Sequence, residues 1–467
     1  MERLTDVERV RSAHEQPFEQ GAARLGSAGG ARILQDSPRS WYVLAILTIS
    51  YSLSYIDRQV LNLLIDPIKR SLLLTDTELS LIQGVAFISA YLLASPFFGR
   101  LVDTMNRRNI LIFGVCTWSI FTALCGRADT FVELFLARFG VGLAEACALP
   151  VGWSMISDYF SVKRTTRAFS IYSLGSLIGG GLSLVAGGAV IASTDTLRRQ
   201  FVALAELANW QLTFVLVGLP GLLFALVLLT VKEPERRASL KSTVDDRSFT
   251  KSEAARYLWT RRGFFGNIYL GNGLLAIVAL GLPAWFPSFL IRHHGVPPAM
   301  VGFKFGLLVV TVGSLGVLSA PWIARLFERA GHKDATVRAS AFCTLGMMAA
   351  CAAVPLVPTP EMALVAAAVA VFCWSVPTCN LAVSVQLVSP SRMRGVTASL
   401  YTFFAQIIGF GIGQTLIAMV TDRVFGNPSL VGNSLGIVGF SASVGSAILL
   451  FSSLRYYRWM LEEESRS

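Results

Sequence analysis

Residues 41–64 read WYVLAILTISYSLSYIDRQVLNLL, an apolar stretch that is interrupted near its end by Asp57 and Arg58. About 20 such residues in a helix cross the ~30 Å hydrocarbon core of a bilayer. A charge at that depth costs about 2.5–3.5 kcal/mol on insertion scales, so proteins that retain one generally use it. A later apolar stretch retains Arg138 and Glu145. These stretches predict a membrane protein with a charged functional site.

The rest of the chain repeats the apolar pattern. Of its 467 residues, 53% are hydrophobic and 15% are charged. Twelve apolar segments are predicted to be spans, at 41–65, 79–101, 109–127, 131–157, 168–192, 210–231, 264–290, 299–324, 337–356, 362–387, 396–420 and 433–454. The sequence therefore predicts an all-α polytopic membrane protein whose twelve transmembrane helices form two pseudo-symmetric six-helix bundles. The bundles are expected at 41–231 and 263–456, joined by a hydrophilic linker at 232–262.

The basic residues predict the orientation of the chain. With a cytoplasmic amino terminus, 30 of the 40 Lys and Arg residues fall in inner segments and 8 in outer loops. The positive-inside rule then places the tail 1–40, the linker 232–262 and the tail 457–467 in the cytoplasm. No cleavable signal peptide is evident before residue 41, so we expect the first span to direct the chain to the inner (plasma) membrane. Residues 251–260 of the linker are expected to form a surface helix.

Composition also argues against several functions. The net charge of +11 is spread over inner segments next to spans, where anionic lipid headgroups are the nearest partners, so we expect no nucleic-acid binding. The seven cysteines lie in apolar spans without CxxC spacing, and the four histidines show no metal-ligand pattern. No Walker lysine or catalytic His/Asp set is present. We therefore expect no metal, no cofactor and no enzymatic activity.

The two halves of the chain are related in sequence. Residues 96–103 read PFFGRLVD and residues 321–328 read PWIARLFE, so that proline, arginine, leucine and an acid recur at an offset of 225. A weaker match recurs at an offset of 230. Two matches at similar offsets indicate duplication. Paired halves with a cleft between them are the architecture in which a transporter alternates access by rocking one half against the other.

The loop after the second span carries a family signature. Residues 99–108 read GRLVDTMNRR, which resembles the G-x-L-x-D-x-x-G-R-[RK] loop of the major facilitator superfamily. Asn106 replaces the usual glycine, and asparagine tolerates the left-handed backbone conformation. The alternative is that the loop is basic simply because it is an inner loop. The resemblance implies a latch that breaks as the halves rock. Its residues would be Gly99, Asp103, Arg107 and Arg108.

The first and fourth spans carry a more specific pattern. Residues 55–61 read YIDRQVL, and residues 138–146 read RFGVGLAEA. Both resemble the Spinster-type branch of the superfamily, whose members have a D-R-Q-V-L first span and a fourth span with an arginine, glycines and a Glu-Ala pair. The resemblance runs from about residue 41 to residue 188. It departs at Ala144, where glycine is common. The branch is linked to the transport of sphingolipids and lysolipids.

The spacing of the four charges has a physical meaning of its own. Arg138 and Glu145 are two helical turns apart, so they share one helix face and lie ~10 Å apart along its axis. Asp57, Arg58 and Arg138 come to a similar depth in the membrane, with Glu145 two turns deeper. Asp57 can pair with Arg138, and Arg58 with Glu145, but the sequence does not decide which pairs form.

These charges suggest proton coupling. Burial disfavours an ionised carboxylate and a nearby arginine favours it, so separating the two changes its affinity for a proton. We expect Asp57 and Glu145 to carry protons, and Arg58 and Arg138 to balance their charge or to meet an anionic substrate group. The Spinster resemblance implies the same roles for these positions. The alternative is a static buried salt bridge that only fixes helix packing.

The remaining polar residues in the spans are uncharged. Those expected in a cavity are Tyr55, Asn267, Asn272, Asn380 and Gln406. The alternative is that they form hydrogen bonds between helices. A cavity with one charged wall suits an amphipathic substrate, such as a lysolipid or sphingolipid-like molecule, or an organic anion. The main rival is a sugar-acid or organic-anion proton symporter, and a less favoured one is a non-transporting receptor or enzyme. We expect a monomer whose partners are substrate, protons and membrane lipids.

Overall fold

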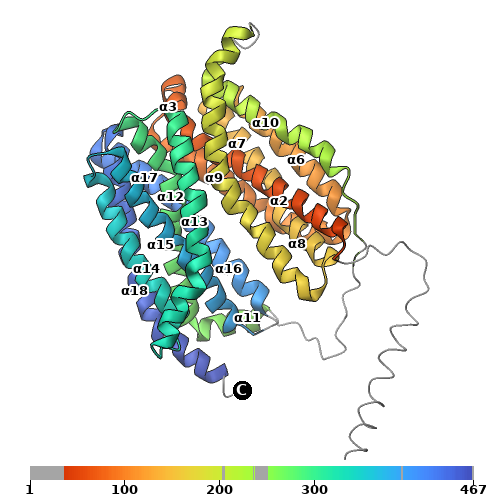
Figure 1. Ribbon diagram of the computed structural model, residues 1–467, viewed down its shortest axis with the longest axis vertical. Coiled ribbons are helices and arrows are strands. Elements are labelled where there is room, and N and C mark those ends of the chain that lie inside the picture. The colour runs from red at the N-terminus through yellow and green to blue at the C-terminus, as the bar shows by residue number, and fades with distance from the viewer. Residues whose placement is uncertain (1–35, 202–205, 235, 237–250, 391–392, 465–467) are drawn as a thin grey trace, which may run out of the picture.

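The computed structural model of the chain is built from helices (Figure 1). It describes residues 36–201, 206–234, 236, 251–390 and 393–464. Most of the predicted amino-terminal tail and much of the linker lie outside these ranges, as do the last residues of the carboxyl-terminal tail. The first half contains α2 (Pro38–Gln59), α3 (Leu61–Leu72), α4 (Asp76–Ser80), η1 (Leu81–Ala86), α5 (Phe87–Thr104), α6 (Arg107–Cys125), α7 (Phe131–Glu145), α8 (Ala148–Tyr159), α9 (Val162–Gln200) and α10 (Asn209–Leu228).

The linker contributes α11 (Lys251–Thr260). The second half that follows it contains α12 (Arg262–Arg292), α13 (Pro298–Arg329), α14 (Ala335–Ala353), η3 (Val354–Leu356), α15 (Pro360–Leu387), α16 (Arg394–Gln406), η5 (Ile407–Gly413), α17 (Gln414–Met419), η6 (Val420–Phe425), η7 (Pro428–Leu430) and α18 (Val431–Glu464). The helix α11 coincides with the surface helix expected at 251–260, so that prediction is confirmed.

The predicted fold class is confirmed. Among the described residues, 11 helices are long and apolar enough to cross a membrane. The remaining predicted span is α2 with α3, whose serines, tyrosines and buried charged pair make it less apolar than the others. Several helices extend beyond their apolar cores, as α9 does over Val162–Gln200. Polar end turns can continue a helix outside the hydrocarbon, so hydropathy alone underestimates helix length.

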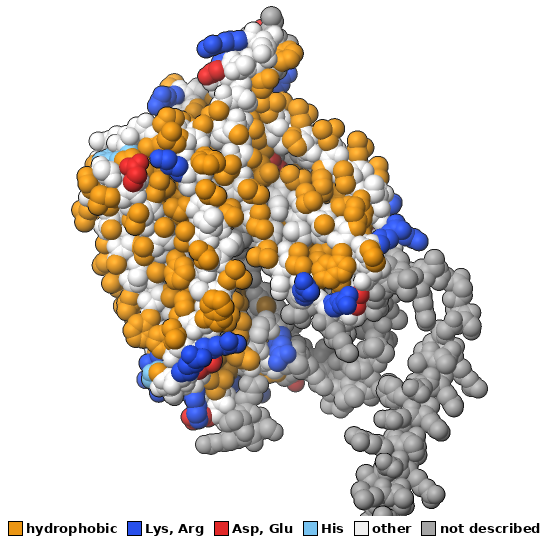
Figure 2. Space-filling model, in the orientation of Figure 1, with side chains coloured by type: hydrophobic (Ala, Val, Ile, Leu, Met, Phe, Trp, Pro, Cys, Tyr) orange, Lys and Arg blue, Asp and Glu red, His pale blue; other side chains and the backbone are white. Residues whose placement is uncertain are grey.

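The surface matches a membrane setting. Figure 2 shows hydrophobic side chains over the sides of the helices, with Lys, Arg, Asp and Glu gathered at the two ends. Phe113, Leu318 and Trp322 are 65%, 64% and 67% exposed. Apolar surface of this extent is stable when lipid covers it.

The two ends of the molecule differ. We call the end that carries residues 232–234 and α11 the linker end. The opposite end, where α3 meets α12, is the closed end (Figure 1). At the closed end Arg292 of the second half pairs with Asp66 (Nε–Oδ1, 2.6 Å) and Asp76 (Nη1–Oδ2, 2.7 Å) of the first. The Thr77 N–H and hydroxyl both donate to Asp422 Oδ2 at 2.7 Å. Charged groups therefore join the halves at this end.

Close backbone contact joins the halves deeper in the molecule. A Cβ on Gly84 in η1 would lie 2.2 Å from the carbonyl oxygen of Phe410 in η5, so only glycine fits there. Both elements are π-helical, and π-helical turns frequently occur at functional sites. This crossing lies beside the cavity described below, and α9 packs against α13 in a second crossing.

Candidate functional site

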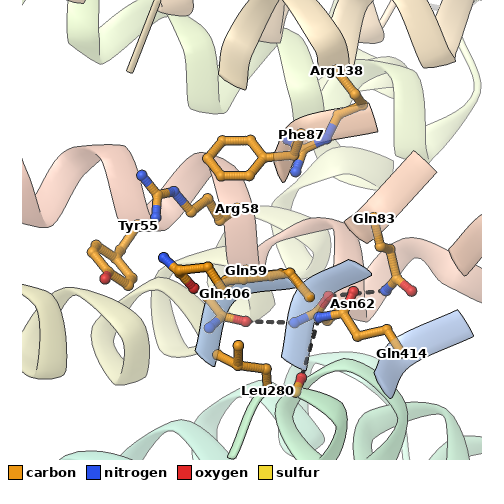
Figure 3. A pocket seen from close by; sticks show the side chains of 11 residues that line it. Tyr55, Arg58, Gln59, Asn62, Gln83, Phe87, Arg138, Leu280, Gln406 and Gln414 are labelled. Atoms are coloured by element: carbon orange, nitrogen blue, oxygen red, sulfur yellow. Dashed lines mark hydrogen bonds between the residues drawn. The ribbon is translucent and has the colours of Figure 1, made fainter. Parts of the chain in front are cut away.

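A cavity of about 80 Å³ lies between the two halves (Figure 3). Its lining residues are Tyr55, Arg58, Gln59, Asn62, Gln83, Phe87 and Arg138 from the first half, and Leu280, Gln406, Phe410 and Gln414 from the second. The first half therefore supplies both charged residues, and the second supplies amide and apolar side chains. Of the expected cavity residues, Tyr55 and Gln406 line this space.

One of the two ion pairs that the sequence allowed is formed. Arg58 Nη2 lies 2.5 Å from Glu145 Oε2, and Arg58 Nε donates to the same oxygen at 2.6 Å. The Arg58 side chain is 7% exposed and that of Glu145 is fully buried. The guanidinium also lies 4.5 Å from the ring centre of Phe87 and 4.8 Å from that of Tyr55. A desolvated guanidinium over aromatic faces gains cation–π attraction in addition to its ion pair.

Arg138 meets Asp57 in another way. Its Nη1 donates to the backbone carbonyl of Asp57 at 2.9 Å, and Asp57 forms no ion pair with a described residue. Arg138 is 1% exposed, and its Nε has no hydrogen-bond partner among the described residues. Phe87 lies beside both arginines (Figure 3). Gly142 makes this possible, because a Cβ there would lie 2.3 Å from the Phe87 carbonyl oxygen.

The Asp57 side chain belongs to a different space. Asp57 is 4% exposed and lines a separate crevice of about 110 Å³ between α2, α6, α9 and α10. It is absent from the lining of the central cavity, which its neighbour Arg58 contacts. The two adjacent residues therefore face two different spaces beside α2, since consecutive side chains on a helix diverge by about 100°.

A row of amides forms part of the cavity wall. Gln83 donates to Asn62 at 3.0 Å, and Asn62 donates to Gln59 at 2.5 Å (Figure 3). Sequence reasoning did not assign Gln59 and Asn62 to the site. Residues 55, 59 and 62 are spaced as neighbours on one helix face, so that periodicity could have indicated Gln59 and Asn62 once Tyr55 was chosen.

Three other expected cavity residues lie elsewhere. Asn267 donates to the Gly263 carbonyl at 2.8 Å within its own helix. Asn272 accepts from the Tyr401 hydroxyl at 3.0 Å, and Asn380 donates to the Ala320 carbonyl at 3.4 Å. Asn272 and Asn380 thus join helices of the second half, which is the alternative that the sequence left open.

The charged residues lie where helices are interrupted. Arg58 is in the last turn of α2, next to the junction with α3, and Glu145 is the last residue of α7 before α8 begins. Together with η1 and η5, these junctions surround the cavity. Interrupted membrane helices are tolerated where they line a cavity, and in transporters they commonly form the binding site.

The expected latch has partners that the sequence did not indicate. Buried Arg107 contacts Asp158, and its Nε lies 2.7 Å from Glu233 Oε1. The backbone N–H of Arg108 donates to the other oxygen of Glu233 at 2.9 Å. Since Asp158 ends the fourth span and Glu233 begins the linker, Arg107 fastens the linker to the first half.

Asp103 and Gly99 stand apart from this network. Asp103 is exposed and forms no ion pair with a described residue, while Arg236 of the linker donates to the carbonyls of Val102 and Met105 at 3.0 and 2.6 Å. A Cβ on Gly99 would meet no atom within 4 Å. Neither Asp103 nor Gly99 therefore takes part in the Arg107 network.

The site residues do not form a metal centre. Across the described ranges, no three His, Cys, Asp or Glu side chains are close enough together to hold a metal ion. The polar groups at the cavity are arginines, amides and one buried glutamate, which suit an anionic or hydrogen-bonding solute.

Comparison with known proteins defines the class. The family model of the Major Facilitator Superfamily matches residues 47–414, and the chain therefore belongs to this superfamily of membrane transporters, which are not enzymes. Within it the similarity is to the Spinster type, so the resemblance seen in the first and fourth spans is confirmed. Human Protein spinster homolog 1 is 27% identical over 455 residues, covering 91% of this chain and 83% of that protein.

Two further relatives support this placement. The crystal structure of a bacterial homologue of the human lysosomal transporter Spinster, in an inward-facing and unoccupied conformation, superimposes with a TM-score of 0.77. It is 26% identical and covers 91% of this chain and 97% of that chain. An MFS-type efflux pump of Mycolicibacterium smegmatis is 25% identical over 433 residues, covering 91% of this chain and 95% of the pump.

Proposed function

We propose that the chain is a proton-coupled secondary active transporter that moves an amphipathic, lysolipid- or sphingolipid-like solute, or an organic anion, by alternating access. The observation that carries this proposal is the buried Arg58–Glu145 ion pair, whose arginine lines a cavity between the two halves. We further propose that it acts as a monomer in the inner (plasma) membrane, with both termini in the cytoplasm, as the positive-inside rule predicts.

The ion pair offers a means of coupling. Protonating Glu145 would release Arg58, whose guanidinium would then be free to bind an anionic group of the substrate in the cavity. Losing the proton would restore the pair and displace that group. Arg138, which has an unpartnered Nε, supplies a second cation next to the same space. Arg138 contacts Asp57 by donating a hydrogen bond to the Asp57 backbone carbonyl.

The closed end is where access to the cavity would alternate. The pairs of Arg292 with Asp66 and Asp76 cross between the halves and would have to break for the cavity to open at that end. The two halves would then approach each other at the linker end, bringing exposed Asp103 toward a partner. In this scheme Arg107 holds the linker to the first half throughout the cycle.

A second candidate substrate is a small, fully polar organic anion such as a sugar acid. The observation that favours it is the lining itself, in which Gln59, Asn62, Gln83, Gln406 and Gln414 accompany the two arginines. Amides and arginines together recognise hydroxyl and carboxylate groups. An amphipathic substrate would in turn use Phe87, Leu280 and Phe410 for its apolar part.

The test is proton-driven flux in proteoliposomes, using a substrate chosen by a pH-dependent thermal-shift screen of lysolipids, sphingoid bases and organic acids. We expect Asp57→Asn and Glu145→Gln each to lower flux driven by a pH gradient by about 100-fold or more, the scale of a lost proton-transfer group. Asp57→Asn should keep expression and thermal stability close to those of the parent. Glu145→Gln leaves buried Arg58 without its partner and should be less stable, so its flux is compared per amount of folded protein.

The matched control is Glu361→Gln, which removes a carboxylate whose side chain is 68% exposed at the start of α15. It should transport as the parent does. Normal pH-driven flux by Asp57→Asn or Glu145→Gln would remove that residue from the mechanism. If the parent protein transports none of the screened substrate classes, the proposed substrates are contradicted.

A further inference from the structure

The crevice that Asp57 lines has a counterpart in the second half. In the first half its walls include Leu53, Ile56, Leu216, Val217, Pro220 and Gly221. A larger crevice of about 300 Å³ in the second half has walls that include Leu274, Ile277, Ile437, Val438, Ser441 and Ala442. Each of these residues lies 221 positions after its partner in the first list. The same helix packing therefore leaves the same crevice in both halves.

The two crevices differ in the residue at the position of Asp57. Position 57 is aspartate in the first half, whereas the equivalent position in the second half is Val278, a buried residue. Trp118 and Ser119 of α6 also line the first crevice, while the lining of the second is apolar apart from Ser441. The first half has thus placed a carboxylate and hydrogen-bonding groups in a space that the fold leaves apolar.

A polar group on the wall of the first crevice has no protein partner. Ser119 Oγ is buried and makes no hydrogen bond within the described residues. Thr122 lies three residues further along the same face of α6, next to Asp57. The Trp118 indole nitrogen lies 4.0 Å from where a Cβ of Gly221 would be, on the crevice wall. Each unmade hydrogen bond of this kind costs about 1–3 kcal/mol unless water completes it.

The crevice is large enough for that water. One water needs ~10–15 Å³ of such space and two to four polar partners. The crevice has about 110 Å³ and offers a carboxylate, a hydroxyl and an indole N–H. We propose that this crevice is a hydration chamber in which a small cluster of water molecules binds Asp57, Ser119 and Trp118. Through it Asp57 exchanges its proton without contact with the substrate cavity. This inference rests on the proposed proton-coupling role of Asp57.

The surrounding charges are consistent with this division. On α2 the neighbouring Arg58 turns toward the central cavity, and from α7 Arg138 and Glu145 lie on that same side. From α6, Cys125 interacts electrostatically with Asp57. The residues of α9 and α10 that line the crevice are all non-ionisable. Substrate and proton thus occupy two different spaces beside α2, and Arg138, bonded to the Asp57 carbonyl, links them.

The test follows the proton on Asp57 directly and needs no substrate. The full chain is placed in lipid nanodiscs, and the infrared band of the protonated Asp57 carboxyl is identified by its loss in Asp57→Asn. The rate at which this band shifts when H2O is replaced by D2O is then measured. We expect Val217→Phe, which fills the chamber, to slow the exchange by about tenfold or more because it displaces water.

The chain offers two matched controls. Val438→Phe makes the same change in the second crevice, and Leu280→Trp fills the central cavity instead. Both should exchange at the parent rate. Ser119→Ala removes one water partner without adding bulk, and it should slow exchange even if Val217→Phe folds poorly.

The outcomes are separable. Parent-like exchange in both Val217→Phe and Ser119→Ala, or slowing only in Leu280→Trp, overturns the chamber while leaving the proton role of Asp57 intact. If no carboxyl band depends on Asp57 and Asp57→Asn also transports normally, the proposed proton role of Asp57 fails instead. Slowing in Val217→Phe and Ser119→Ala alone supports the chamber.

Discussion

The two halves share one helix arrangement but differ sharply in the charges they bury. Asp57, Arg58 and Gln59 of the first half correspond, 221 positions later, to Val278, Ala279 and Leu280 in the second. The fourth span of the first half contains Arg138 and Glu145, whereas its counterpart α15 has a single acid, Glu361, near its start. Duplication has kept the shape of the halves, while the chemistry has been concentrated in one of them.

This asymmetry has a physical reason. Rocking separates the halves, so an ion pair between them at the cavity would be broken in every cycle and leave two buried charges unpaired. Arg58 and Glu145 belong to the same half and can stay paired until a proton or a substrate intervenes. At the closed end the opposite holds, since Arg292 pairs across the halves where water can solvate the separated charges.

The largest effect should come from breaking the pair inside the first half. In Arg58→Met, fully buried Glu145 loses its partner, and an uncompensated buried charge costs about 3–5 kcal/mol. We expect a clearly lower thermal unfolding midpoint in detergent. The double variant Arg58→Met, Glu145→Gln should recover most of the loss because no charge remains. Ala279→Met, the equivalent position of the second half, is the control and should unfold near the parent temperature. A fully stable Arg58→Met would show that Glu145 is not ionised against Arg58.

An intermediate effect is expected where charges cross between the halves. Arg292→Gln removes the pairs with Asp66 and Asp76, and truncating one member of a well-ordered pair costs about 2–5 kcal/mol. Since ~5.5 kcal/mol takes a two-state population from 1:99 to 99:1, this change should open the closed end measurably.

Spin labels at exposed Leu73 and Val424, one on each half, would report the opening as a longer distance in pulsed electron resonance. Arg261→Gln, which breaks a pair with Glu463 inside the second half, is the control and should leave the distance unchanged. An unchanged distance in Arg292→Gln as well would mean that other contacts hold the closed end.

The fold could be predicted because its signal is local. Each span is an apolar run whose length is set by the bilayer, so residues 107–125 and 360–387 were located to within two residues at each end from composition alone. The first span was also found, although its polar residues make it the least apolar of the set. What hydropathy cannot indicate is where a helix changes its hydrogen-bonding pattern, and η1 and η5 were therefore not anticipated.

The site was predictable only in part, for a similar reason. Buried charges are costly wherever they occur, so Arg58, Arg138 and Glu145 stand out in sequence. Which pairs form depends on side-chain direction, and the sequence could not decide between them. Amide side chains also occur in membrane helices as hydrogen-bonding groups between helices. No feature of the neighbouring sequence distinguishes Gln414, which lines the cavity, from Asn380, which joins two helices.

The smallest expected effect comes from a substitution in the part of the cavity wall that the second half supplies, which carries no charge. Gln414 is 4% exposed, its Nε2 donates to the Leu280 carbonyl at 3.3 Å, and its Oε1 has no partner among the described residues. That free oxygen can accept a hydrogen bond from a polar solute. Gln414→Leu should therefore weaken binding of a hydroxylated organic anion by about 0.5–1.5 kcal/mol, or several-fold, and leave the pH dependence of flux unchanged. For a lysolipid, the apolar surface that Gln414→Leu adds should leave the affinity equal to that of the parent or make it higher. Isothermal titration with both probes decides between the substrate classes, and a shifted pH profile would show that the second half shares in proton coupling after all.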